Sequence, residues 1–168
     1  GFCSQNEWRG ERPNFLVGGR VNNHNMMKNA VFSPRVNVRY SPTPAVGLRA
    51  SYASGYRAPQ AYNEDLHIDA LDNKVAVIRL DPNLRPEYSH SLSASVDLYR
   101  NFGRVQGNLL VEGFYTVLDD LFTLEKVGED AHGNVIKERR NAAAATLAGI
   151  GVEAKAGIPG RFEFQLGY

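Results

Sequence analysis

The sequence has little of several features that define whole classes of protein. It has a single cysteine, Cys3, so it can form no internal disulfide and no zinc site built on cysteines. No apolar run approaches the roughly 18 residues that a membrane-spanning helix needs. The surplus of basic residues is only one, since the sequence has 19 Lys and Arg and 18 Asp and Glu. Because phosphate binding needs a larger surplus, nothing in the sequence predicts a nucleic-acid partner.

What the sequence has is a repeated alternation of apolar and polar residues. Its 168 residues are enough for one domain, and 43% of them are hydrophobic, so the chain is not of a disordered type. Between Tyr88 and Tyr99, Leu92, Ala94, Val96 and Leu98 at even positions alternate with four serines and Asp97 at odd ones. A period of two over such a length predicts β-strands rather than helices. Seven strands are predicted, over residues 15–21, 31–40, 46–56, 88–99, 105–117, 150–156 and 161–168.

Short and long connections alternate between these strands. Tight turns with Pro or Gly join three of the strand pairs, whereas residues 22–30, 57–87 and 127–134 form longer connections. In an up-and-down sheet, this alternation places every short turn on one rim, as in transmembrane β-barrels. A soluble β-sandwich or a lipocalin-like barrel would show the same alternation with its apolar face turned inward. Charged residues on the polar face favour the membrane barrel, whose wide lumen accommodates them.

A set of short motifs occurs in a specific order along the chain. They are Phe32-Ser-Pro-Arg35, Leu48-Arg-Ala-Ser-Tyr52, Gly55-Tyr-Arg-Ala-Pro59, Leu84-Arg-Pro-Glu87, Phe114-Tyr115, Asp120-Leu-Phe122, Asn141 to Ala145, and Gly151-Val-Glu153. With these motifs, the sequence from about Phe15 onward resembles the barrel of a TonB-dependent outer-membrane receptor. The stretch over residues 58–68 further resembles receptors of a Bacteroidetes-like branch.

The resemblance implies the fold and the domain organisation. The family pattern is a 22-stranded barrel that follows an N-terminal plug domain and a segment that engages TonB. We therefore expect an all-β, antiparallel up-and-down transmembrane β-barrel, present as a fragment of about seven strands. Residues 13–168 are expected to form this partial barrel domain, with the plug domain absent, and residues 1–12 an irregular segment. Both ends of the chain read as cut, since no starting Met or signal peptide is present and the last residues resemble a strand.

The function implied by the resemblance is nutrient uptake in the bacterial outer membrane. The full receptor would bind a scarce nutrient, such as a metal chelate, siderophore or cobalamin. Its partners would be the lipid, its own plug domain and TonB. The alternative is a soluble, secreted β-sheet domain that binds carbohydrate or protein. An enzyme is not expected, because no G-x-S-x-G motif is present and the adjacent Asp119 and Asp120 point to opposite faces of a strand. No cofactor is expected.

The connection over residues 57–87 contains the candidate ligand contacts, Tyr62, Glu64, Asp65 and His67. Loops on a rigid scaffold often have a binding role. Carboxylate and imidazole groups can bind transition metals. Nevertheless, neighbouring polar residues on an exposed loop are more typical of a solvated loop or lid, and no metal site is predicted.

Three arginines, Arg35, Arg39 and Arg49, fall on the predicted lumen face if their strands pair in register. They could line a path for an anionic ligand or contact the plug domain. The interpretation that we favour is a salt-bridge ladder with neighbouring carboxylates.

Overall fold

A computed structural model describes residues 1–24, 27, 29–59, 77–129, 131, 133, 135–142 and 144–168. These residues form eleven strands and no helix. In chain order the strands are β1 (Phe2–Arg9), β2 (Pro13–Asn22), β3 (Val31–Thr43), β4 (Val46–Arg57), β5 (Val77–Leu80), β6 (Glu87–Phe102), β7 (Val105–Asp119), β8 (Phe122–Glu129), β9 (Val135–Asn141), β10 (Ala145–Ile158) and β11 (Phe162–Gly167). No helix that is long and apolar enough to cross a membrane occurs in this described part of the chain.

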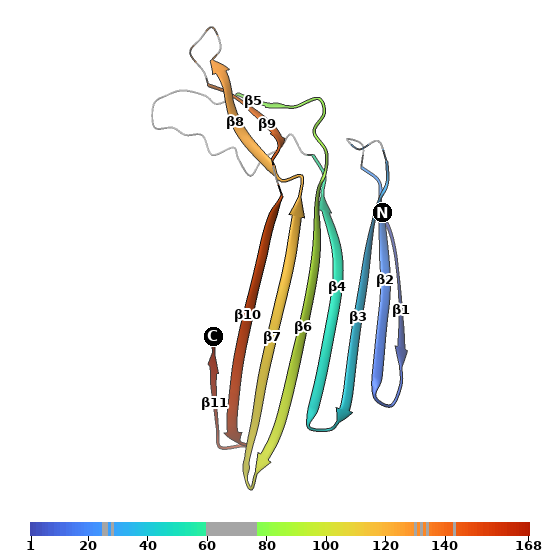
Figure 1. Cartoon of the computed structure of the whole chain (residues 1–168), viewed down its shortest axis with the longest axis vertical. Coiled ribbons are helices and arrows are strands. Elements are labelled where there is room, and N and C mark those ends of the chain that lie inside the picture. Colours follow the sequence, from blue (N-terminus) through green and yellow to red (C-terminus); the bar gives the residue numbers. More distant parts are fainter. Residues whose placement is uncertain are drawn as a thin grey trace.

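Eight of the strands form one tall antiparallel sheet in the order β1-β2-β3-β4-β6-β7-β10-β11 (Figure 1). The prediction of an all-β antiparallel barrel fold is confirmed. The sheet is not closed in this chain, because β1 and β11 are its two edges. A second, three-stranded sheet in the order β5-β9-β8 lies beyond one end of the tall sheet. Within it, β5 pairs with β9 in parallel and β9 pairs with β8 in antiparallel orientation.

The strand count differs from the prediction of about seven. The seven predicted strands are all present, but β1, β5, β8 and β9 were not predicted. The expectation of an irregular segment over residues 1–12 is wrong, because β1 pairs with β2 from Phe2 opposite Val21 to Arg9 opposite Asn14. The face of β1 that includes Phe2 and Trp8 has polar residues between them, so no period of two was visible in the sequence.

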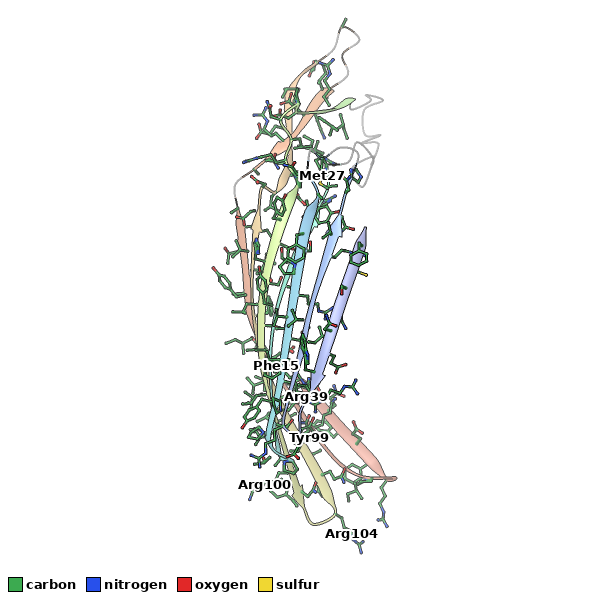
Figure 2. All side chains as sticks on the ribbon, turned by 90° about the vertical axis from the view of Figure 1, so that its right-hand side faces the viewer. Phe15, Met27, Arg39, Tyr99, Arg100 and Arg104 are labelled. Carbon is green, nitrogen blue, oxygen red and sulfur yellow. The ribbon has the colours of Figure 1, made fainter. Side chains whose placement is uncertain are left out.

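The connections place the short turns at one end of the tall sheet and the long ones at the other (Figure 1). Gly103 in the β6–β7 turn and Gly160 in the β10–β11 turn have φ values of 63° and 74°. A residue with a Cβ atom rarely adopts such angles, so glycine permits these tight reversals. Figure 2 shows Arg104 at the tip of the β6–β7 turn and Met27 toward the opposite end. The second sheet lies on the side of the long connections.

The tall sheet has almost no buried core. Val31, Ala58 and Pro59 are the only apolar side chains buried among the described residues. One face is apolar and widely exposed, as Leu92 at 57%, Ile150 at 74% and Phe164 at 62% illustrate. Side chains project from both sides of the long strands (Figure 2). Such an apolar face requires an apolar environment outside the chain.

Candidate functional site

The face opposite the apolar one is polar and continuous across the tall sheet. Strand register places Arg39 opposite Arg49, Arg49 opposite Ser95, Ser95 opposite Glu112, and Glu112 opposite Gly151. Hydroxyl pairs connect neighbouring strands on the same face, with 2.6 Å between Ser51 Oγ and Ser93 Oγ and 3.0 Å between Ser91 Oγ and Thr116 Oγ1. Successive side chains of a strand point to opposite faces of the sheet, so this polar row and the apolar face come from alternate positions of the same strands.

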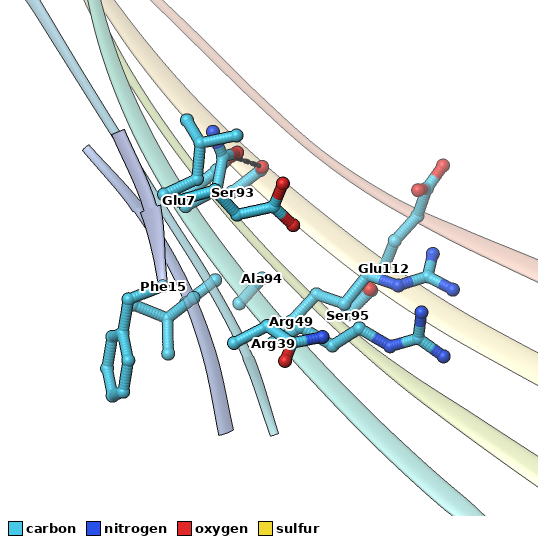
Figure 3. Close-up of a pocket in the computed structure, with 14 residues that line it drawn as sticks. Glu7, Phe15, Arg39, Arg49, Ser93, Ala94, Ser95 and Glu112 are labelled. Atoms are coloured by element: carbon cyan, nitrogen blue, oxygen red, sulfur yellow. Dashed lines mark hydrogen bonds between the residues drawn. The ribbon is translucent and has the colours of Figure 1, made fainter. Parts of the chain in front are cut away.

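The structure brings two of the three predicted arginines directly together. Arg39 and Arg49 are opposite each other on β3 and β4, and Arg35 lies further along the same face of β3. Figure 3 shows Arg39 and Arg49 extending side by side, with Glu112 beside them. Arg39, Arg49 and Glu112 line a hollow of about 350 Å³. Its other lining residues include Glu7 of β1 and Ser95 of β6, with further residues of β2, β3 and β4. All three arginines therefore share the polar face, and their exposure to a lumen stays a prediction.

The hollow is electrostatically uneven. Arg49 forms an ion pair with Asp97, with 2.8 Å between Nη2 and Oδ2, and Asp97 is only 4% exposed. The described residues provide no ion-pair partner for Arg35 or Arg39. Like charges directly opposite each other on a sheet destabilise it, so the pairing of Arg49 with Asp97 relieves part of the repulsion from Arg39. Among the described residues, only Arg49 of the three arginines therefore has a carboxylate partner, and the salt-bridge ladder stays a prediction.

The four candidate contacts in the long connection, Tyr62, Glu64, Asp65 and His67, lie outside the described residues. In the part of the chain that the structure describes, no group of three or more His, Cys, Asp or Glu side chains could hold a metal ion.

The second cluster lies at the long-connection end, where the tall sheet meets the three-stranded sheet. We call it the rim junction, and it comprises Arg57, Arg85, Glu87, Asp120, Phe122 and Asn141. Arg85 Nη2 lies 2.6 Å from Asp120 Oδ1, and the carboxamide of Asn141 bonds to the backbone of both residues. Asp120 has a φ of 56°, in the left-handed region that Asp tolerates better than most residues. It turns the chain from β7 into β8.

The other half of the rim junction is built around Phe122. Its backbone N–H donates to Oε1 of Glu87, and the Arg57 guanidinium lies over its ring at 5.6 Å from the centroid. Arg139 lies over the same ring at 5.9 Å. Arg57 is also opposite Glu87 in the β4–β6 register, with 3.6 Å between Nη1 and Oε2. A cation over an aromatic face is stabilising, and more so where water is excluded.

Sequence reasoning did not predict the rim junction as a site. Its residues all belong to motifs that were used for the resemblance: Gly55-Tyr-Arg-Ala-Pro59, Leu84-Arg-Pro-Glu87, Asp120-Leu-Phe122, and the stretch that begins at Asn141. These motifs are as much as 84 residues apart in sequence, from Arg57 to Asn141, and meet in space. Their order along the chain was the available signal, but only the fold brings the motifs together.

A tall antiparallel sheet with one exposed apolar face, one polar face and one-sided short turns defines a segment of the wall of a large membrane β-barrel. The whole chain, residues 1–168, matches the family described as TonB dependent receptor-like, beta-barrel. The chain belongs to this family. It is a family of outer-membrane receptors and transporters for small nutrients, not of enzymes.

Solved structures show the same fold. The siderophore receptor PirA from Pseudomonas aeruginosa matches with a TM-score of 0.71 and 15% identity, over 98% of this chain and 33% of that one. The FrpB iron transporter from Neisseria meningitidis matches with a TM-score of 0.64 and 16% identity, over 93% and 23%. The copper transporter OprC matches with a TM-score of 0.60 and 15% identity, over 98% and 28%. The chain thus spans a third or less of these proteins. No curated protein matches it.

Proposed function

We propose that this chain forms part of the barrel wall and extracellular rim of a receptor that imports a scarce nutrient across the bacterial outer membrane. Residues 13–168 form the partial barrel domain, with β1 now added to them: the eight strands of the tall sheet supply the wall, and the three-stranded sheet belongs to the rim. The plug domain and TonB are partners of the full-length protein, and TonB relays to the receptor the energy that import requires. The nutrient is of the metal-chelate, siderophore or cobalamin type. No catalytic step is assigned to any residue.

The observation that carries this proposal is the exposed apolar face of the tall sheet, together with the position of its short turns, which all lie at one end. A soluble, secreted β-domain would have to cover Leu92, Val96, Ile150 and their neighbours, yet Val31, Ala58 and Pro59 are the only apolar side chains buried in the described chain. Lipid covers such a face without a protein core, since the outward surface of a membrane barrel is an apolar band. The soluble alternative is therefore not favoured.

The polar face and the long connections have separate roles in this proposal. Arg35 and Arg39 face the plug domain or an anionic ligand path, because no described carboxylate pairs with them. Tyr62, Glu64, Asp65 and His67 are proposed as ligand contacts at the cell surface, on the side of the long connections. The solved relatives in fold include siderophore, iron and copper transporters, so a metal-containing cargo is the first class to test.

The test uses the full-length receptor in its own host. Cells that lack the gene, and matched cells that lack TonB, are supplied with radiolabelled ferric siderophores, copper or cobalamin. Each compound is the sole source of its metal or vitamin in the medium. We expect TonB-dependent uptake of one of these classes, restored by the intact gene. A receptor with Glu64→Ala and His67→Ala should lose uptake while it still folds, and Arg104→Ala in the opposite turn is the matched control. Uptake unchanged by gene deletion for every class would contradict the proposal.

A further inference from the structure

Asn141 occupies an unusual position at the rim junction. Its Oδ1 accepts a hydrogen bond from the backbone N–H of Arg85 at 2.8 Å, and its Nδ2 donates to the carbonyl oxygen of Arg85 at 2.9 Å. Nδ2 also donates to the carbonyl oxygen of Asp120 at 2.6 Å. The side chain thus meets the backbone of Arg85 as a paired strand would, with both a donor and an acceptor.

These bonds connect segments that belong to different sheets. Asn141 ends β9 and is opposite Phe122 of β8, so its backbone belongs to the three-stranded sheet. Arg85 leads into β6, and Asp120 follows β7, so both belong to the end of the barrel wall. Side-chain contacts that join the two sheets in the described chain gather here, at Asn141 and around Phe122, and the Arg85–Asp120 ion pair lies beside them within the wall.

The barrel wall does not depend on Asn141 for its own pairing. β6 and β7 pair continuously from Tyr88 opposite Asp119 to Phe102 opposite Val105, and β10 pairs with β7 over thirteen positions. Loss of the Asn141 hydrogen bonds should therefore leave the wall folded and allow only the three-stranded sheet to change its orientation. Substitution of a residue whose role is only to stabilise the wall would instead impair folding of the wall itself.

We propose that Asn141 is a positioning residue, which fixes the three-stranded sheet on the barrel rim and thereby sets the affinity for the extracellular ligand. The second half of this statement rests on the uptake function proposed above. Asn141→Asp is the sharpest change, because it is isosteric and replaces the donor by a carboxylate that faces two carbonyl oxygens. Asn108→Asp is the matched control, since Asn108 makes a similar bond to the carbonyl oxygen of Leu98 inside the wall.

The first measurement needs no ligand. Nitroxide labels at Val127 of β8 and at Ile150 of β10, both exposed, report the distance between the sheets in the full-length receptor by pulsed electron paramagnetic resonance. We expect one narrow distance distribution for the native receptor and for Asn108→Asp. Asn141→Asp should broaden that distribution at least twofold, with heat-modifiable folding of the barrel unchanged. If the Asn141→Asp receptor is not recovered, Asn141→Ala removes the same bonds without adding charge. An unchanged distribution in the recovered variant would overturn the proposal.

The second measurement separates this inference from the uptake function. Binding of ferric enterobactin, a copper salt and cobalamin is measured for each receptor. For whichever probe the native receptor binds, we expect at least a tenfold loss of affinity in Asn141→Asp and none in Asn108→Asp. Equal affinity despite a broadened distance distribution would overturn the claim about the ligand. If the native receptor binds none of the probes, the uptake proposal fails, while the distance measurement still decides whether Asn141 positions the sheet.

Discussion

A lysine placed on either face of the same strand should have very different costs. Val96 lies on the apolar face of β6, between Leu48 and Val111 in the register, and is 38% exposed. Ser95, its neighbour, lies on the polar face between Arg49 and Glu112. We expect Val96→Lys to destabilise the full-length receptor strongly and Ser95→Lys to destabilise it little, because Glu112 offsets the added charge beside Arg49.

The magnitude follows from the depth of Val96 in the bilayer. On the outward face of β6, the apolar stretch is bounded by His90 and Arg100, ten residues apart. At ~3.4 Å per residue that is about 34 Å of strand. A strand tilt of ~40° reduces it to roughly 26 Å of height, which matches the ≈ 25 Å apolar band of such barrels. Val96 is one residue from the centre, so lysine there should cost close to the ~2–4 kcal/mol found at a bilayer midplane.

The assay is urea unfolding of the full-length receptor in lipid vesicles, followed by the heat-modifiable shift on gels. Val96→Ile is the control for side-chain exchange at that site. Ser95→Lys should stay within about 0.5 kcal/mol, as surface substitutions usually do. If Ser95→Lys were the more damaging variant, the lipid and lumen faces would be exchanged. Folding of any variant in plain buffer, without lipid or detergent, would refute the barrel interpretation itself.

Three further outcomes follow from the structure. Arg49→Ala should cost about 1–3 kcal/mol in urea unfolding, because it leaves the buried carboxylate of Asp97 without its cation. Asp97→Asn should cost less, since the half-exposed arginine can be hydrated; the reverse order would contradict this argument. Gly103→Ala should cost roughly 1–2 kcal/mol because of its φ of 63°, with no steric contact to add to that cost. In intact cells and in a cysteine-free background, a cysteine at Glu125 should react with an impermeant maleimide, whereas one at Arg104 should react only after permeabilisation; the opposite result would invert the topology.

The sequence was sufficient for the parts of the fold that repeat with a period of two. The strands around Val96 and Ile150 alternate cleanly because one face is apolar and the other polar, so the sequence alone predicts that they are strands. β1 was missed because Ser4 and Asn6 interrupt its outward face. β8 and β9 were missed because a sheet outside the membrane band needs no apolar face, and their residues follow no simple period.

The candidate sites, like the strands, were predicted from the sequence only in part. The shared face of Arg35, Arg39 and Arg49 follows from parity and register alone. Sequence could not pair Arg49 with Asp97, because the two residues are on strands separated by a long connection. The rim junction was beyond sequence reasoning for a further reason. The three hydrogen bonds of the Asn141 side chain go to the backbone of Arg85 and Asp120, and backbone partners leave no trace in residue types.

The most direct test of the central claim is a nitroxide scan along β6 of the full-length receptor in lipid vesicles, from Ser91 to Leu98. At each position, the accessibility of the label to oxygen, which concentrates in lipid, is compared with its accessibility to a water-soluble nickel complex. The two quantities should alternate with a period of two, with oxygen dominant at even positions such as Val96 and nickel dominant at odd ones such as Ser95. Low accessibility to both at the even positions, which is the signature of a packed protein core, would contradict the account.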